Sequence, residues 1–241
     1  MDSRIEELGW KSSPMGEISL RRRYDSVLNA EVYEVKLDEE FLMSSAFPVA
    51  EIELSHLGLA RTPGEHLNVI VGGLGLGYTA QAALEDPRVD NLTVVEYSDA
   101  VIDWHERDLL PDTEGLAADE RVHLSHADFF ATAMGTVGFD PDNPGFQWDA
   151  ILLDIDHSPR WVLHLPHADF YGVEGLQAMS EHLKPGGCFA IWSDDPPDDE
   201  FMEILEAVFI DVTAKRVWFD NPYTRGRSSN TVYVATKPAQ T

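Results

Sequence analysis

An apolar strand runs directly into a glycine turn in Val69-Ile-Val-Gly-Gly-Leu-Gly-Leu-Gly-Tyr78, and a second apolar strand, Leu92-Thr-Val-Val-Glu96, ends on a carboxylate. This pattern is typical of the first half of a nucleotide-binding α/β site. Glycines let the backbone approach the ligand closely, and the acid binds ribose hydroxyls. The sequence therefore predicts an α/β fold in which the turn and Glu96 face the same ligand.

The spacing of the glycines indicates which nucleotide the turn binds. A dinucleotide turn has glycines at positions i, i+2 and i+5, but after Gly73 and Gly75 the third place is held by Tyr78. The chain has the tighter form, which ends at Gly77 and is typical of S-adenosylmethionine sites. Glu96 follows Gly77 by 19 residues, the separation expected of a ribose ligand at the end of the second strand.

Length and composition are those of a globular protein with a substantial core. The chain has 241 residues, 44% of them hydrophobic, enough for one large α/β domain with or without a small appendage. The single cysteine, Cys188, excludes an intrachain disulfide and is expected to be a small core residue. No run is long enough to span a membrane, and Met1-Asp-Ser-Arg-Ile-Glu-Glu lacks a signal-peptide pattern, so we expect a cytoplasmic protein.

The net charge of −26 restricts the partners that the protein can have. It repels nucleic acid and anionic membranes, and it suits a cationic ligand such as a polyamine or a sulfonium compound. For most of these carboxylates the simpler interpretation is a solvated acidic surface. We therefore expect a small cationic amine as substrate and no nucleic-acid or membrane partner.

Two domains are expected. Residues 17–43 alternate apolar and polar side chains as strands do, and residues 48–60 carry apolar side chains at helical spacing. The stretch 61–65 is rich in breaking residues and is a natural boundary. We predict a β-rich N-terminal domain with a connecting helix over 1–62 and a Rossmann-like adenosyl-binding domain over 63–241.

Strand and helix patterns alternate after the boundary. Expected strands cover 67–71, 92–96, 121–124, 149–153, 188–192, 212–219 and 229–236, and expected helices cover 78–85, 99–108, 129–134, 170–183 and 198–208. Lys184-Pro-Gly-Gly187 is predicted to stop the fourth of these helices. The alternation predicts a mostly parallel, methyltransferase-like Rossmann sheet, with the last two strands forming an antiparallel edge.

Acidic residues follow most of the expected parallel strands, at the edge where such sheets bind ligands. They are Glu96 with Tyr97, Asp128 with Phe129, Asp154 with Asp156, and Asp194 with Asp195. Asp128 and Phe129 pair an acceptor with an aromatic ring, which suits an adenine whose amino group donates and whose face stacks. An equally good interpretation of Asp128 is a helix N-cap.

Asp154 ends the most apolar strand of the chain, Ala150-Ile-Leu-Leu153. Partial desolvation there raises the pKa of a carboxyl group and suits it to proton transfer. The alternative is a structural aspartate bonded to nearby backbone N–H groups. We favour the functional interpretation, because perturbed acids cluster at such sites.

A group of histidines after this strand raises the question of a metal site. His157, His164, His167 and Asp169 lie close together in the sequence, but their spacing matches no standard set of metal ligands. We expect these side chains to be structural and the protein to need no metal.

Taken in order, these segments resemble the spermidine synthase family, the polyamine aminopropyltransferases. The likeness covers nearly the whole chain, and the order and spacing of the motifs are more specific than any single motif. The segments that carry it are 71–77, 94–102, Asp128-Phe129, 148–154 with Pro159, 170–176, 183–187 and Asn221-Pro-Tyr223.

The resemblance implies a donor, an acceptor and roles for individual residues. It implies decarboxylated S-adenosylmethionine as donor, with Glu96 binding the ribose and Asp128 the adenine amino group. Asp154 would hold the amine or take its proton, with Asp156 or Asp194 as the amine anchor. Tyr223 would line the polyamine end of the site. Family members commonly associate through their N-terminal strands, so the resemblance also implies a homo-oligomer.

The chain departs from the family pattern at three places. The family's glycine turn usually holds an aspartate that binds the aminopropyl amine, and here Leu74 or Gly75 stands there. The paired aspartates after the fourth strand become Asp154-Ile-Asp156-His157. The glutamine expected after the fifth strand is Trp192.

These departures leave two alternatives open. The first is a methyltransferase that uses ordinary S-adenosylmethionine on a small molecule. That donor carries a carboxylate, and the sequence has no basic residue between Val69 and Asp86 to bind it, which favours the decarboxylated donor. The second is a nucleoside-binding homologue without catalysis, because a fold alone does not establish an activity.

Overall fold

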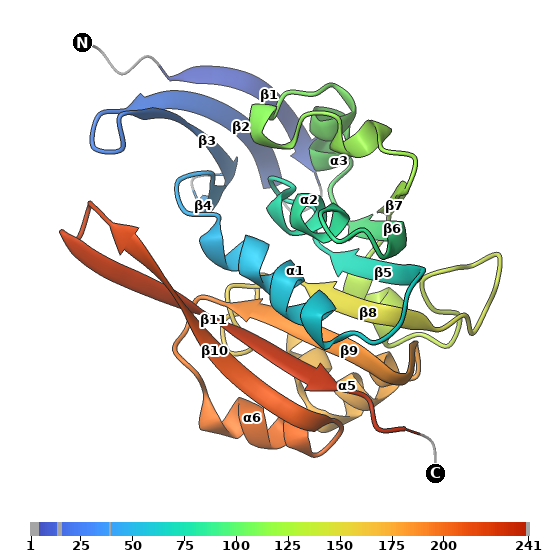
Figure 1. The fold of residues 1–241 in the computed structure, drawn as a ribbon. Coiled ribbons are helices and arrows are strands. Elements are labelled where there is room, and N and C mark those ends of the chain that lie inside the picture. The colour runs from blue at the N-terminus through green and yellow to red at the C-terminus, as the bar shows by residue number, and fades with distance from the viewer. Residues whose placement is uncertain (1–4, 14–15, 39, 240–241) are drawn as a thin grey trace.

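The computed structural model describes residues 5–13, 16–38 and 40–239 as two sheets with helices around the larger one (Figure 1). The smaller sheet is antiparallel and consists of β1 (Glu6–Ser13), β2 (Gly16–Asp25), β3 (Ala30–Leu37) and β4 (Glu40–Ser44), in that order. The strands expected in residues 17–43 are therefore confirmed. Strand β1 was not predicted. The shift in β1 register between Glu7 and Gly9 interrupts the alternation that would have revealed it.

The larger sheet has seven strands in the order β10-β11-β9-β8-β5-β6-β7. Their bounds are β5 Leu67–Gly72, β6 Val89–Glu96, β7 Val122–His126, β8 Trp148–Leu153, β9 Leu183–Ser193, β10 Ile210–Asn221 and β11 Gly226–Thr236. Strands β5 to β9 are parallel, and β10 and β11 are antiparallel at one edge. The predicted α/β class and antiparallel edge are confirmed. The strand order reverses at β5, which places a ligand crevice beyond the carboxyl ends of β5 and β8.

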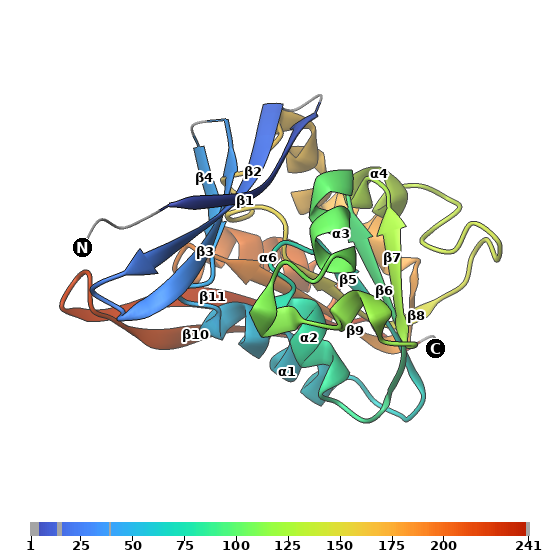
Figure 2. The same cartoon turned by 90° about the horizontal axis from the view of Figure 1, so that it is seen from above.

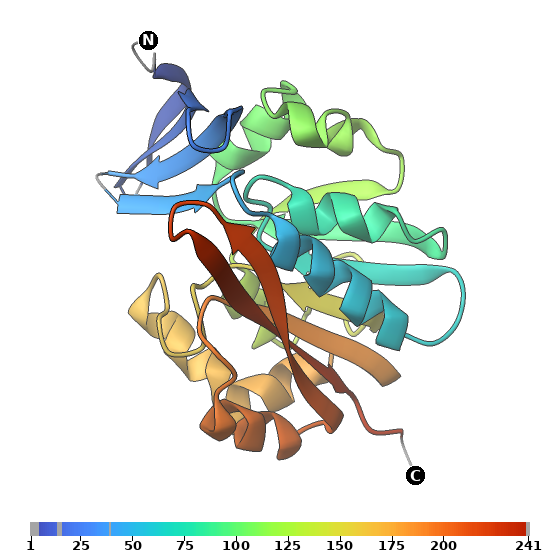
Figure 3. The same ribbon diagram turned by 60° about the vertical axis from the view of Figure 1, so that its left-hand side comes forward.

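Helices cover both faces of this sheet (Figure 3). On one face lie α1 (Val49–Arg61), α2 (Tyr78–Leu84) and α3 (Asp99–Glu106), and on the other α4 (Phe129–Ala133), α5 (Val173–Ser180) and α6 (Asp199–Glu206). Short 3-10 helices are η1 (Pro111–Thr113), η2 (Leu116–Ala118) and η3 (Leu165–Tyr171). The last four residues of β5 (69–72) and of β8 (150–153) are buried, which explains their apolar sequences.

The helix predicted over 170–183 is shorter than expected. Its first part is the 3-10 helix η3, and α5 ends at Ser180. Gly186 is left-handed, with a φ of 79°, but it lies inside β9 and does not end a helix. The Pro-Gly-Gly run was predicted to end a helix but lies near the start of a strand, because such a run is typical of both positions. Cys188 is fully buried in β9, as predicted, and burial raises the pKa of its thiol to about 12.

The small sheet sits against the large unit at two places. Strand β1 packs on α3, where a Cβ added at Gly9 would lie 2.5 Å from the Trp104 Nε1, and the Lys11 ammonium pairs with Asp99 at 2.6 Å. The tip of the β10–β11 hairpin extends to the small sheet from the other side (Figures 1 and 2). The two-domain division at residues 62 and 63 stays a prediction, and α1 packs on the large sheet.

Candidate active site

The glycine turn between β5 and α2 has a conformation that requires its glycines. Gly73, Gly75 and Gly77 have φ values of 91°, 50° and 88°, all in the left-handed region. A Cβ at Gly73 would lie 2.2 Å from the carbonyl oxygen of Asp154, and one at Gly77 would lie 2.7 Å from the His105 ring. The turn is therefore tied to the end of β8 by close backbone contact.

Glu96 ends β6 directly beside this turn. Its Oε2 accepts a hydrogen bond from the Leu74 N–H at 2.9 Å, and its Oε1 accepts one from the Ser98 N–H at 2.7 Å. Burial raises the pKa of this carboxyl group, while the backbone donors lower it. The predicted juxtaposition of the turn and Glu96 is present, and the adjacent Tyr97 is half exposed.

The two residues that open α4 after β7 differ in how they meet their expected roles, because Asp128 is an N-cap and Phe129 is buried in the core. Asp128 caps α4, with its Oδ1 accepting from the Ala131 N–H at 3.1 Å. The Phe129 ring was expected to stack on an adenine, but it is 2% exposed and packs against Phe139 and Phe170 in the core. The expectation was wrong because the first residue of α4 faces the sheet. Asp128, which is exposed, remains accessible to a ligand.

Asp154 follows β8 and lies beneath the glycine turn. Its N–H donates to the Gly72 carbonyl at 2.8 Å, and its Oδ2 accepts from the Thr79 hydroxyl, at the start of α2, at 2.6 Å. As expected from its place after a buried strand, burial raises the pKa of Asp154, to about 6. A carboxyl group whose pKa is raised in this way is suited to proton transfer.

Glu51 in the first turn of α1 was not predicted, although it interacts with Asp154. The Thr79 hydroxyl that bonds Asp154 also contacts the Glu51 carbonyl at 3.4 Å. Burial, then the charges of Asp154 and Asp194, raise the pKa of Glu51 to about 8. No sequence pattern indicates this residue, because only the packing of α1 on the sheet brings it to the strand ends.

Asp156 has a different environment from Asp154. It is 3% exposed and accepts hydrogen bonds from the Leu163 N–H at 2.6 Å, from Tyr171 at 2.8 Å and from the His167 ring at 3.1 Å. These three partners all belong to the segment that follows β8. Asp156 thus stabilises that segment, and its oxygens are occupied by protein donors.

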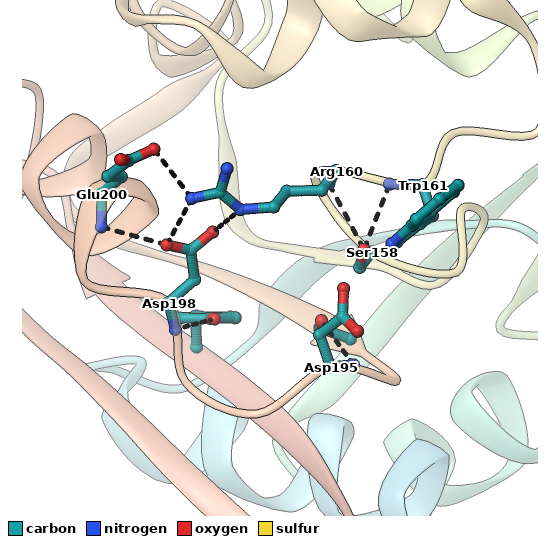
Figure 4. A network of polar contacts seen from close by, with 8 residues as sticks. Ser158, Arg160, Trp161, Asp195, Asp198 and Glu200 are labelled. Carbon is teal, nitrogen blue, oxygen red and sulfur yellow. Dashed lines mark hydrogen bonds and ion pairs between the residues drawn. The ribbon is translucent and has the colours of Figure 1, made fainter.

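The segment after β8 is also fastened to the start of α6, as Figure 4 shows. The Arg160 guanidinium bonds both carboxylate oxygens of Asp198 and lies 2.8 Å from Glu200. Ser158 accepts from the N–H groups of Arg160 and Trp161 at 3.3 and 3.1 Å. The wall of the site is therefore held at both ends, by Asp156 and by Arg160.

The histidines of this segment have structural contacts. His167 stacks on Phe130 with ring centroids 3.9 Å apart, and His164 lies edge-on to His167. Over the described part of the chain, no three His, Cys, Asp or Glu side chains are arranged to hold a metal ion. In the same part, no helix combines the length and apolar character needed to cross a membrane.

Tyr223 lies at the tip of the β10–β11 hairpin, against the small sheet. Its hydroxyl donates to Asp25 at 2.5 Å, and its ring meets Phe47 edge-on at 5.9 Å between centroids. Asp25 also pairs with Arg23 at 2.5 Å, and Tyr223 with Arg23 holds the pKa of Asp25 well below its usual range. Phe47 precedes α1, so this contact joins the hairpin, the small sheet and the helix that carries Glu51.

Comparison with known proteins gives a weak sequence match and a strong structural match. No family model matches the chain. It is 28% identical over 144 residues to putrescine N-methyltransferase 3 of Nicotiana tabacum, covering 60% of the chain and 34% of that protein. It is also 28% identical over 132 residues to a polyamine aminopropyltransferase of Oceanobacillus iheyensis, covering 54% of the chain and 23% of that protein. The matched stretch thus spans about a third of the curated relatives or less.

The structural comparison covers almost the entire chain. The spermidine synthase of Thermotoga maritima superposes with a TM-score of 0.72 at 18% identity, covering 97% of this chain and 74% of that one. The chain has the spermidine synthase fold. A second spermidine synthase structure, in complex with the transition-state analogue AdoDATO, gives a TM-score of 0.71 over 97% of this chain and 73% of that one. The predicted resemblance is confirmed for the fold.

Within the spermidine synthase fold, the structure brings together some of the predicted residues and separates others. The glycine turn, Glu96 and Asp154 lie at the carboxyl ends of β5, β6 and β8, and Asp194 follows β9. Asp156 is turned into the following segment, and Tyr223 lies at the hairpin tip beside Asp25. Asp194 is exposed, with its Oδ1 accepting from Asn230 at 2.6 Å, so of the two predicted amine anchors it is the accessible one.

Proposed function

We propose that the protein is a transferase that moves an aminopropyl group from decarboxylated S-adenosylmethionine to a small cationic amine such as putrescine. The observation that supports this most is the carboxylate of Asp154 under the glycine turn, together with Glu51, which feels the charges of both Asp154 and Asp194. Such a set of acids suits cationic substrates, and none of the ion pairs between described residues neutralises Glu51 or Asp154.

The adenosyl group of the donor would be held by the glycine turn and Glu96, with Asp128 beside the base. The left-handed glycines leave the turn without side chains at three positions, so a ligand can approach the backbone. Glu96 already accepts two backbone hydrogen bonds, and each carboxylate oxygen has a second lone pair for a ribose hydroxyl.

The reaction needs a deprotonated amine and an in-line approach. The amine nitrogen attacks the carbon beside the sulfonium, a C–N bond forms, and the C–S bond breaks with its electron pair leaving on sulfur as a neutral thioether. The proton lost by the amine goes to Asp154, whose raised pKa suits it to this transfer. No general acid is required, because the leaving group is neutral. Asp154 is therefore the proposed base.

A second candidate activity is methyl transfer to an amine. It is supported by the sequence match to the putrescine N-methyltransferases, which is of the same identity as the match to the aminopropyltransferase. The same turn, Glu96 and Asp154 would serve both reactions. The donors differ by a carboxylate, and the absence of a basic residue between Val69 and Asp86 favours the decarboxylated form.

Parallel calorimetric titration with S-adenosylmethionine, its decarboxylated form and methylthioadenosine tests this proposal. We expect the decarboxylated donor to bind more tightly than the carboxylated one, and incubation with putrescine to give a product with one added aminopropyl group by mass spectrometry. Tighter binding of the carboxylated donor with a methylated product would establish the second candidate. Binding of none of the three would overturn both. The cytoplasmic location and the homo-oligomer remain predictions from the sequence.

A further inference from the structure

The start of α1 contains a polar side chain that the fold leaves without a partner. Among the described residues, the Glu51 Oε2 is buried and accepts no hydrogen bond. Buried polar atoms are almost always bonded, and a carboxylate oxygen without a donor is costly to bury. Pro48, the N-cap residue, makes no side-chain cap bond, and the Glu51 carboxylate faces the N–H groups of Ala50 and Glu51 itself. One side of this carboxylate is thus engaged, and the other has no protein partner among the described residues.

Trp192, near the end of β9, is the second unpartnered group in this region. Its Nε1 is buried and donates to no acceptor in the described part of the chain. Ala190, two residues earlier on the same face of β9, packs against α1 at Gly58, where an added Cβ would lie 3.2 Å from it. Trp192 therefore lies closer than Ala190 to the carboxyl end of β9, which is the end of the sheet at which α1 begins.

The charges at this end of the sheet are not balanced by the protein. The charges of Asp154 and Asp194 raise the cost of ionising Glu51, and the Thr79 hydroxyl bonds the Asp154 carboxylate and contacts the backbone carbonyl of Glu51. A single ammonium group beside Asp154 would leave the Glu51 carboxylate uncompensated. A second ammonium on the same molecule would compensate it.

We propose that Glu51 is the specificity-determining residue of the acceptor site and binds the distal ammonium of a diamine. The reacting amine lies at Asp154. This inference rests on the proposed function, because it assigns Glu51 to the acceptor of that reaction. The site thereby discriminates an α,ω-diamine from a monoamine of the same length, whose distal end would place a methyl group against a buried carboxylate.

The experiment compares two acceptors on the protein saturated with methylthioadenosine. Binding of 1,4-diaminobutane and of butylamine is measured by calorimetry for the natural protein, for Glu51→Gln and for the control Glu53→Gln. Gln keeps the size of the side chain and removes its charge. Glu53 lies on the same helix turn but pairs with Lys215 at 2.9 Å, outside the acidic set.

We expect the natural protein to bind the diamine at least about tenfold more tightly than butylamine, the factor that one charge-assisted hydrogen bond supplies. Glu51→Gln should weaken diamine binding by about the same factor and leave butylamine and methylthioadenosine binding unchanged. Glu53→Gln should behave as the natural protein. Diamine binding at pH 7 should also release protons, seen as a buffer-dependent heat, and Glu51→Gln should reduce that release.

The outcomes separate this inference from the proposed function. Amine binding that keeps its preference for the diamine in Glu51→Gln would overturn the role of Glu51 and leave the transferase standing. Methylthioadenosine binding with no amine binding by the natural protein would overturn both. Loss of methylthioadenosine binding in Glu51→Gln would show a general structural effect and would overturn the assignment as well.

Discussion

Asp154 and Asp156 follow the same strand two residues apart, yet the structure uses them differently. Asp154 accepts one side-chain hydrogen bond, from Thr79, and burial raises its pKa to about 6. Asp156 accepts three, all from the segment that it stabilises. The comparison shows that burial alone does not mark a functional acid, since Asp156 is buried and Asp154 is only partly buried. The number of hydrogen bonds that the protein donates to a carboxylate decides whether it stabilises the fold or remains available to a ligand.

The largest effect expected from this comparison is on turnover. Asp154→Asn keeps an acceptor for the Thr79 hydroxyl and removes the proton acceptor of the reaction, so kcat should fall by about 10²–10⁴-fold. Methylthioadenosine binding by calorimetry should stay unchanged, as should the turnover of the control Asp142→Asn, an exposed loop residue. Full turnover in Asp154→Asn would remove Asp154 as the base.

The corresponding change at Asp156 should act on stability. In Asp156→Asn, one of the three donors from Leu163, His167 and Tyr171 would face an NH₂ group, so we expect unfolding in urea to become easier by roughly 2–3 kcal/mol. Asp142→Asn should be within about 0.5 kcal/mol of the natural protein. Unchanged stability together with lost turnover would reverse the roles given to the two aspartates.

The same comparison shows how far the sequence could take the interpretation. The glycine spacing, the strand alternation and the acid at the end of β6 predicted the turn, the parallel sheet and the position of Glu96, because each depends on local sequence. Asp154 was predicted for a similar reason, as the acid that ends the most apolar strand of the chain. These are features in which backbone conformation and burial follow directly from neighbouring residues.

The remainder depended on contacts between distant segments. Glu51 enters the site because α1 packs across the sheet, and Asp156 leaves it because Leu163 and Tyr171 supply donors from up to 15 residues away. The inward orientation of Phe129 likewise follows from the docking of α4. No spacing rule contains this information, so the sequence identified a set of acids but did not separate the free ones from the engaged ones.

The pH dependence of stability should sharpen the comparison between free and engaged acids. In the folded protein Glu51 keeps its proton up to a pKa of about 8, whereas in the unfolded chain it loses its proton near the ordinary pKa of 4.5. The folded state therefore binds more protons than the unfolded state between these two pH values. The contribution of Glu51 to stability is complete below pH 4.5 and falls as the pH rises to 8.

We expect the free energy of unfolding of the natural protein to decrease relative to Glu51→Gln over this window, by at most about 1.4 kcal/mol per pH unit. Urea unfolding at pH 5, 6, 7 and 8 measures the difference. Glu53→Gln should follow the natural protein throughout. Parallel pH profiles for the natural protein and Glu51→Gln would mean that Glu51 ionises normally and that its carboxylate is not held without a partner.

The smallest effect is expected at the other fastening of the segment after β8. The Arg160 side chain is 53% exposed, so its pairs with Asp198 and Glu200 are screened by water, and Arg160→Gln should lower the free energy of unfolding by less than Asp156→Asn does. Arg107→Gln is the matched control, with 54% exposure and a single pair to Asp103 at 2.9 Å, and it should cost less still. Because Arg160 lowers the pKa of Asp198, the contribution of this pair to stability is present above the ordinary pKa of 3.8 and is lost as the pH falls below it. A cost above that of Asp156→Asn at neutral pH would show that the exposed pair, and not the buried carboxylate, holds this wall of the site.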